Sequence, residues 1–161
     1  EAIEQAFKIA RKQNITTVLN PAPAIELPKS LLELTDIIIP NETEAELLTG
    51  ISINNESDMK ETATYFLDLG ISAVLITLGE QGTYCAYQEQ YKMIPACNVK
   101  AIDTTAAGDT FIGAFLSELN KDLSNLESAI RLANQASSLT VQRKGAQASI
   151  PTRKEVEAEY N

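Results

Sequence analysis

A run of small residues that ends in an aspartate is the stretch of this sequence best suited to chemistry, Asp103-Thr104-Thr105-Ala106-Ala107-Gly108-Asp109-Thr110-Phe111. Small side chains let the backbone approach a ligand closely, and a helix that begins here would point its first N–H groups at an anion. An aspartate at the helix start could accept a proton from a hydroxyl while those amides stabilise phosphate charge. Phosphoryl transfer requires this combination of positioning, electrostatics and a base.

The same residues also allow a simpler interpretation, in which Gly108 and Asp109 only begin and cap a helix, since Asp is favoured there. The stretch alone leaves the two interpretations open. No GxxxxGK[ST] loop is present, which excludes a P-loop protein. The chain also has no histidine, which excludes Ser-His-Asp and Cys-His catalysis and His-ligated zinc. A carboxylate is therefore the expected acid or base.

Composition is that of a folded protein without an obvious polyanion-binding surface. The 161 residues are 44% hydrophobic and 22% charged, enough for one domain with a single core. The net charge of −9 makes nucleic acid and acidic membrane surfaces poor partners. Cys85 and Cys97 have no metal-ligand spacing and predict no disulfide framework. No apolar run approaches the roughly 18 residues of a membrane helix, and residues 1–13 predict an amphipathic helix instead of a signal peptide. We expect a cytoplasmic protein.

The elements that must hold the small-residue stretch follow from hydrophobic periodicity. The pattern predicts helices over 1–13, 41–50, about 59–70, after 109 and about 125–142, strands over 16–19, 37–39 and 73–78, and an antiparallel hairpin over 83–95. Strands that alternate with helices predict one α/β domain over residues 1–161 with a largely parallel sheet. In such sheets ligands gather beyond the carboxyl ends of the strands. The loops expected there are Asn20–Ala24, Pro40–Glu44 and Gly79–Gly82.

Beyond these patterns, Asp103–Phe111 followed by Gly113-Ala114 resembles the C-terminal signature of the ribokinase (PfkB-type carbohydrate kinase) family. Four further stretches resemble the family in order and spacing: Val18–Ala24, Pro40–Glu44, Thr77–Gly79 and Arg143–Gln147. The stretches Asn20–Ala24 and Arg143–Gln147 resemble the ribose-phosphorylating members more than adenosine kinases or fructose-phosphate kinases. The resemblance covers the chain but only the later part of a family member, because the Gly-Gly-containing sugar-binding signature and the small β-sheet lid are absent from the sequence.

The resemblance implies a ribokinase-like fold and ATP-dependent phosphorylation of D-ribose at its primary hydroxyl, with ATP, Mg²⁺ and K⁺ as cofactors. Asp109 would be the general base and would touch the sugar. The amides of Ala106, Ala107 and Gly108 would form the anion hole. Asn41 and Glu44 match an Asn-x-x-Glu element that arranges magnesium and phosphates, largely through water. From the residues alone, a helix capping box explains this pair better; the resemblance favours the magnesium role.

The resemblance also assigns nucleotide and potassium positions. The expected nucleotide contacts are Thr77, Leu78, Gly79, Glu80, Gln81 and Gly82, with Asn134 beside the adenine. The expected potassium positions are Asp103, Thr105, Thr140, Arg143, Gly145 and Ser149, acting mostly through backbone carbonyls, which suit a hard cation. Without the resemblance, Thr77–Gly82 predicts an ordinary strand-to-hairpin turn, and Arg143 and Lys144 are solvated charges after a helix.

The resemblance leaves three functions to compare. The first is a ribose kinase with ATP and a small sugar as partners, a homodimer at full length, of which this chain is a part expected to be inactive alone. The second is another sugar or nucleoside kinase of the same family. The third is a non-catalytic nucleotide-binding module, which the intact Ala-Ala-Gly-Asp run disfavours.

Overall fold

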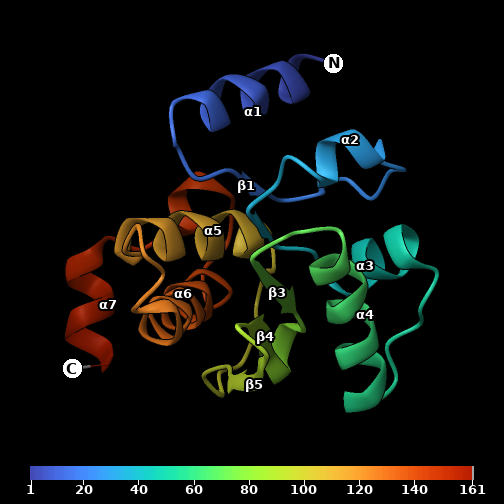
Figure 1. Ribbon diagram of the computed structural model, residues 1–161. Coiled ribbons are helices and arrows are strands. Elements are labelled where there is room, and N and C mark those ends of the chain that lie inside the picture. The colour runs from blue at the N-terminus through green and yellow to red at the C-terminus, as the bar shows by residue number, and fades with distance from the viewer. Residues whose placement is uncertain (161) are drawn as a thin grey trace. The chain divides into compact units, whose positions relative to one another are not determined.

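The computed structural model of the chain describes residues 1–160, and Figure 1 labels their helices and strands. The α-helices are α1 Ala2–Lys12, α2 Lys29–Leu32, α3 Glu42–Thr49, α4 Glu56–Asp68, α5 Ala107–Glu118, α6 Leu126–Thr140 and α7 Arg153–Tyr160. The strands are β1 Val18–Leu19, β2 Ile37–Ile38, β3 Ala73–Thr77, β4 Gly82–Tyr87 and β5 Gln90–Pro95, with short 3₁₀ turns at Gly79–Gln81 and Gln147–Ser149. Residues 1–78 with 84–93 form one compact unit, and residues 79–83 with the described residues from 94 onward form a second.

The strands form one sheet in the order β1-β2-β3-β4-β5. β1, β2 and β3 are parallel neighbours, with Ile37 opposite both Val18 and Ala73. The connections from β3 to β4 and from β4 to β5 are far shorter than the crossover of about a dozen residues that parallel neighbours need, so these two pairs are antiparallel. The α/β class is confirmed, and the sheet is mixed: parallel in its first three strands and closed by the expected hairpin.

The hairpin between β4 and β5 turns on two residues, Gln88 and Glu89, whose φ angles are 48° and 61°. Positive φ at both central residues is the geometry of the two-residue turns that match the twist of antiparallel strands. The predicted hairpin position is therefore right, although neither turn residue is the glycine or asparagine that usually marks such a turn.

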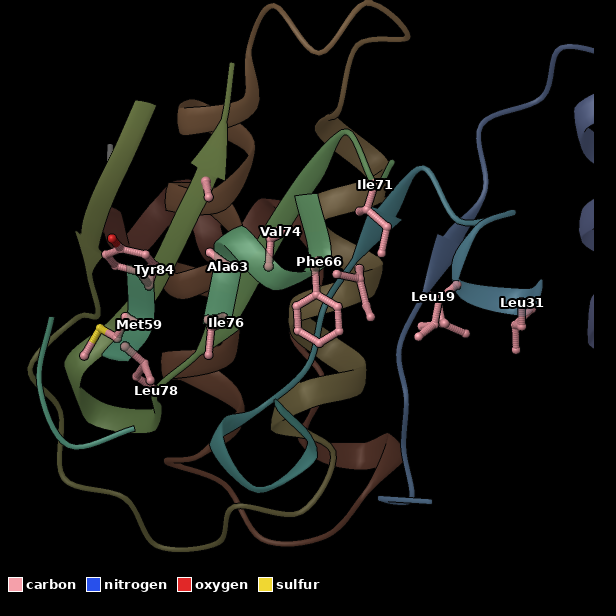
Figure 2. Packing of buried hydrophobic residues seen from close by; sticks show 13 residues of the cluster. Leu19, Leu31, Met59, Ala63, Phe66, Ile71, Val74, Ile76, Leu78 and Tyr84 are labelled. Carbon is pink, nitrogen blue, oxygen red and sulfur yellow. The ribbon is translucent and has the colours of Figure 1, made fainter. Parts of the chain in front are cut away.

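The core of the first unit lies between α4 and the sheet. Met59, Ala63 and Phe66 recur at helical spacing on α4 and are buried, which confirms the apolar face expected for this helix. The first four residues of β3 are all buried, as in a strand covered on both faces. Figure 2 shows Phe66 of α4 and Val74 and Ile76 of β3 directed into the same cluster.

Helix α1 differs from the other long helices because it has no buried residue. Its apolar residues form one stripe, in which Ala2, Ile3, Ala6 and Ile9 are exposed. Ile3 is 56% and Ile9 62% exposed, while Phe7 at the edge of the stripe packs partly on the core of the first unit. Within residues 1–160, α1 therefore presents an apolar stripe that no other element covers.

In the second unit, α5 and α6 lie side by side (Figure 1). Ala129, Ala133 and Ala136 of α6 are buried, so the small residues expected to allow close helix packing do face the interior. On α5, the rings of Phe111 and Phe115 stack with centroids 6.3 Å apart. None of the helices described between residues 1 and 160 has the length and apolarity needed to cross a bilayer.

Candidate active site

The small-residue stretch lies in the second unit and leads directly into α5 (Figure 1). Ala106, the residue before the helix, has φ 62° and ψ 10°, the left-handed conformation. For a residue with a side chain, this conformation costs roughly 1–2 kcal/mol. Such strained positions persist where the surrounding structure fixes them, and they cluster at ligand sites. The backbone at the helix start is therefore held in an unusual shape by its surroundings.

The amides at the start of α5 are not equivalent. Ala107 donates its N–H to the Thr104 carbonyl at 3.2 Å, and Thr110 donates to the Ala106 carbonyl at 2.9 Å. Within the described residues, the N–H groups of Gly108 and Asp109 donate to no protein acceptor. These two amides point out of a helix N-terminus and are available to an anion. Of the three amides expected in the anion hole, Ala107 is the one already engaged.

Asp109 occupies the first turn of α5 with an exposed side chain. α5 has no side-chain cap, so Asp109 does not cap the helix, and the simpler interpretation of this residue lacks its defining hydrogen bond. In the part of the chain that the structure describes, the carboxylate forms no hydrogen bond or ion pair with another residue. A carboxylate beside two available amides can accept a proton from a hydroxyl while the amides bind an anion.

Asp103 hydrogen-bonds both within the small-residue stretch and to the segment that follows α6. Its Oδ1 accepts the Thr105 N–H at 2.9 Å, and its Oδ2 accepts the Gly145 N–H at 2.9 Å. A hydrogen bond from the Thr105 hydroxyl, followed by those from the Gly145 and Thr105 amides, lowers the pKa of Asp103 to about 2. The N–H groups of Ile102 and Asp103 donate to the Val141 carbonyl. Asp103 is thus ionised at neutral pH, and both its oxygens hold backbone amides.

These bonds bring three of the six predicted potassium positions together, namely Asp103, Thr105 and Gly145. Arg143 pairs with Glu155 at 2.8 Å, so its side chain is directed to α7 and only its backbone is available to a cation. Ser149 is buried and donates its hydroxyl to the Ala146 carbonyl at 2.6 Å. Residues 1–160 contain no group of three or more Asp, Glu or Cys side chains that could hold a metal ion. A cation here would need backbone carbonyls, phosphates or water as further ligands.

In the first unit, Asn41 and Glu44 form a capping box on α3. Asn41 Oδ1 accepts the Glu44 N–H at 2.8 Å, and Glu44 Oε2 accepts the Asn41 N–H at 2.9 Å. The predicted capping box is therefore present. It uses only one side-chain atom of each residue. Asn41 Nδ2 and Glu44 Oε1 have no partner among residues 1–160, although Glu44 is only 5% exposed. The cap leaves both side chains able to contact a ligand.

In the first unit, the segment that follows β2 meets the end of β3. Asn41, just after β2, pairs with Thr77 at the end of β3 in a parallel bridge, and the Thr77 N–H donates to the Pro40 carbonyl at 2.9 Å. Beyond Thr77, Gly79 has φ 55°, and Glu80 and Gln81 are exposed. Within the first unit, the carboxyl ends of β2 and β3 therefore lie together, the edge at which ligands bind in parallel sheets.

Comparison with known proteins decides the family. Residues 1–153 match the family described as pfkB family carbohydrate kinase. The chain belongs to this family. It is 64% identical over 155 residues to the ribokinase of Staphylococcus aureus (strain COL), a match that covers 96% of this chain and 51% of that protein. The chain spans about half the length of the curated relatives it matches.

Two solved structures show that this half of a PfkB kinase has the ribokinase-like α/β fold. Arabidopsis thaliana ribokinase complexed with ribose and ATP superimposes with a TM-score of 0.91 at 32% identity, covering 98% of this chain and 51% of that one. A putative ribokinase II from E. coli in complex with ATP and Mg²⁺ gives a TM-score of 0.81 at 26% identity, covering 98% of this chain and 52% of that one.

Asn134 has an internal function in this PfkB kinase chain that sequence reasoning did not anticipate. It is buried, accepts the Thr83 hydroxyl at 3.0 Å, and donates to the Ile94 and Pro95 carbonyls at 3.2 Å. Its side chain thereby links α6 to Thr83, Ile94 and Pro95 within the second unit, and its adenine contact stays a prediction. Thr83 was also missed, because nothing local in the sequence marks a bond across 51 residues.

Gly82 has a packing requirement that the family resemblance does not supply. Its φ is 114°, and an added Cβ would lie 2.6 Å from the Ala96 nitrogen and closer still to the Ile94 carbonyl oxygen. Both neighbours are backbone atoms, which cannot move aside as a flexible side chain can. Glycine is therefore required where β4 begins.

We expect Gly82→Ala to lower the free energy of unfolding by about 3 kcal/mol or more, since strain and overlap each cost about 1–3 kcal/mol. Urea unfolding followed by circular dichroism measures this. The matched control is Gly113→Ala on α5, where an added Cβ meets nothing within 4 Å and φ is ordinary. The control should be neutral or stabilising by up to about 1 kcal/mol. Equal stability of the two variants would contradict the packing argument.

Proposed function

We propose that this chain supplies the nucleotide-binding and catalytic part of an ATP-dependent kinase that phosphorylates D-ribose at its primary hydroxyl. The observation that carries the proposal is the start of α5, where the exposed Asp109 carboxylate lies beside two amides without an internal partner. The similarity to S. aureus ribokinase and to the Arabidopsis ribokinase complexed with ribose and ATP supports ribose and ATP as the substrates. Residues 1–161 act, in this proposal, as one α/β domain in the cytoplasm, where ATP is supplied.

In the proposed reaction Asp109 accepts the proton of the primary hydroxyl as its oxygen attacks the γ-phosphorus of ATP. The bond between that phosphorus and the β,γ-bridging oxygen breaks, which releases ADP. The amides of Gly108 and Asp109, with that of Ala106, donate to the oxygens of the phosphoryl group as charge develops on them. Catalysis by this site rests on positioning and electrostatics, because the chain forms no covalent intermediate in this scheme.

The nucleotide and its magnesium would be held by the loops at the strand ends. The uncommitted Glu44 Oε1 would accept a hydrogen bond from Mg²⁺-bound water, and the uncommitted Asn41 Nδ2 would donate to a phosphate oxygen. Mg²⁺ neutralises phosphate charge when it is bound. The nucleotide would lie along Thr77–Gly82, a stretch in which Gly79, Glu80 and Gln81 are exposed. The E. coli putative ribokinase II in complex with ATP and Mg²⁺ supports this pair of cofactors.

The proposal is tested with a joined kinase, in which the half of S. aureus ribokinase that this chain does not match is fused before Glu1. We expect Mg²⁺- and ribose-dependent ADP formation by the joined kinase. That result would assign the catalytic part to this chain, since the fused half does not contain it. A non-catalytic nucleotide-binding module would bind ATP and give no ribose-dependent turnover. Choice among sugars and formation of a homodimer involve groups outside this chain and stay predictions.

Potassium should raise the turnover of the joined kinase several-fold, and sodium should do so poorly. The reason is that Asp103 gathers Thr105 and Gly145 into one segment whose backbone carbonyls suit a large hard cation. ADP formation is measured in KCl, NaCl and choline chloride at constant ionic strength. Asp103→Asn, which weakens the bonds that gather the segment, should reduce the potassium response. A rate that stays flat from potassium-free buffer to saturating potassium would count against the site.

A further inference from the structure

Two hydroxyl groups of α6 reach across to the first turn of α5. Ser137 Oγ donates to the Ala107 carbonyl at 3.0 Å. Thr140 Oγ1 hydrogen-bonds to Thr110 Oγ1 at 3.0 Å and also lies 3.2 Å from the Ala136 carbonyl of its own helix. Thr140 is fully buried and Thr110 is 5% exposed, so water does not compete for this second bond. All four residues belong to the second unit.

These contacts bracket the residues proposed to do the chemistry. Ala107 immediately precedes Gly108 and Asp109, and Thr110 immediately follows them. The helix start has no side-chain cap of its own and follows the strained residue Ala106. Few local interactions therefore stabilise this turn. The two hydrogen bonds from α6 restrain it at the residues on either side of Gly108 and Asp109.

Satisfaction of a helix hydroxyl within its own helix accounts for part of the Thr140 contacts but not for the Ser137 bond. A serine or threonine on a helix commonly satisfies its hydroxyl on a carbonyl of its own preceding turn, as Ser128 of α6 does with Asn125. Ser137 instead donates to another helix, and it is only half-buried, so burial alone does not demand that partner. The hydrogen bond from Ser137 therefore restrains the position of the Ala107 carbonyl.

We propose that Ser137 and Thr140 are positioning residues that fix the first turn of α5, and with it the Gly108 and Asp109 amides and the Asp109 carboxylate. The inference rests on the proposed function for its catalytic consequence. Misplacement of a catalytic group by about 1 Å can cost up to about 100-fold in rate. Neither side chain touches the substrates in this scheme, so the effect falls on turnover more than on nucleotide binding.

The first test measures steady-state kinetics of the joined kinase carrying Ser137→Ala or Thr140→Val. We expect kcat to fall about 10- to 100-fold, with KM for ATP within about threefold of the parent. Thr140→Ser should restore most of the rate, because it returns the hydroxyl. Ser128→Ala is the matched control: it removes a serine hydroxyl from the same helix that does not reach α5, and its kcat should be unchanged.

The second test uses the 161-residue chain and needs no activity. The Thr110 N–H, which donates to Ala106, should exchange with solvent about tenfold faster in Ser137→Ala than in Ser128→Ala, measured by NMR, because the turn opens more often. An unchanged Thr110 exchange rate overturns the proposal, whether or not the joined kinase is active.

The two proposals can fail separately. If Asp109→Asn abolishes turnover but Ser137→Ala and Thr140→Val match Ser128→Ala in kcat, the positioning proposal is wrong and the catalytic one stands. If Asp109 proves dispensable, the catalytic proposal is wrong, and the Thr110 exchange rate still decides whether α6 holds the turn.

Discussion

Replacement of Asp109 by Asn in the joined kinase should lower kcat for ribose by about 10²- to 10⁴-fold, the usual loss when a general base is removed. Asn keeps the size of the side chain and its position in the first turn of α5, but its amide cannot take up a proton at neutral pH. The Kd for ATP should stay within a few-fold, because the nucleotide is proposed to be held by the strand-end loops and backbone amides. Steady-state ADP release and equilibrium ATP binding measure the two quantities.

The matched control is Asp68→Asn at the end of α4, which removes the same charge from another exposed helical aspartate. It should leave kcat unchanged, so a loss common to both variants would be an effect of net charge. An Asp109→Asn enzyme that retains more than about a tenth of the parental kcat would rule out this residue as the base.

The 161-residue chain alone should show no ribose-dependent ATP consumption, although the joined kinase does. Phosphoryl transfer requires the acceptor hydroxyl to be held in line with the γ-phosphate, and such positioning is worth roughly 7–11 kcal/mol. In this chain Asp109 is exposed, and the sugar-binding signature expected of the family is not in the sequence. Water could then replace ribose as the acceptor, which would give at most a slow hydrolysis of ATP independent of sugar.

The measurement compares ADP release by the purified chain with Mg²⁺, ATP and K⁺, in the presence and absence of ribose. The Asp109→Asn chain gives the background from contaminating ATPases. Robust ribose-dependent ADP formation by the unmutated chain would show that this half binds and orients the sugar without further protein.

Local signals predicted the elements that position the site. Hydrophobic periodicity predicted the helices that contain Met59 and Ile130, the strand that ends at Thr77, and the hairpin. Gly50 marked the end of α3. The capping box of Asn41 and Glu44 was recognisable because its two residues are only three apart. Helix α7 has the same kind of local signal, because the Thr152 N–H donates to Glu155 Oε2 at 2.7 Å, but its hydrophobic periodicity is too weak to have predicted it.

Contacts between distant residues were not predictable in the same way. A threonine or asparagine has the same local pattern whether it faces water, an adenine or a carbonyl on another strand, so the bonds of Asn134 could not be anticipated. The same limit applies to Ser137, whose partner lies 30 residues away. The engagement of the Ala107 amide depends on the left-handed backbone at Ala106, and alanine gives no sign of that conformation. The family resemblance located the stretch proposed to be catalytic, but only the three-dimensional structure distinguishes its amides.

The exposed apolar stripe on α1 also affects the solubility of the purified chain. Four neighbouring apolar side chains on this helix of 11 residues favour self-association, which the net charge of −9 opposes at neutral pH through mutual repulsion. That repulsion vanishes near the isoelectric point of about 4.5. Sulfate salts screen it and strengthen apolar contact at the same time. We therefore expect acidification and salting-out to promote aggregation of this chain through α1.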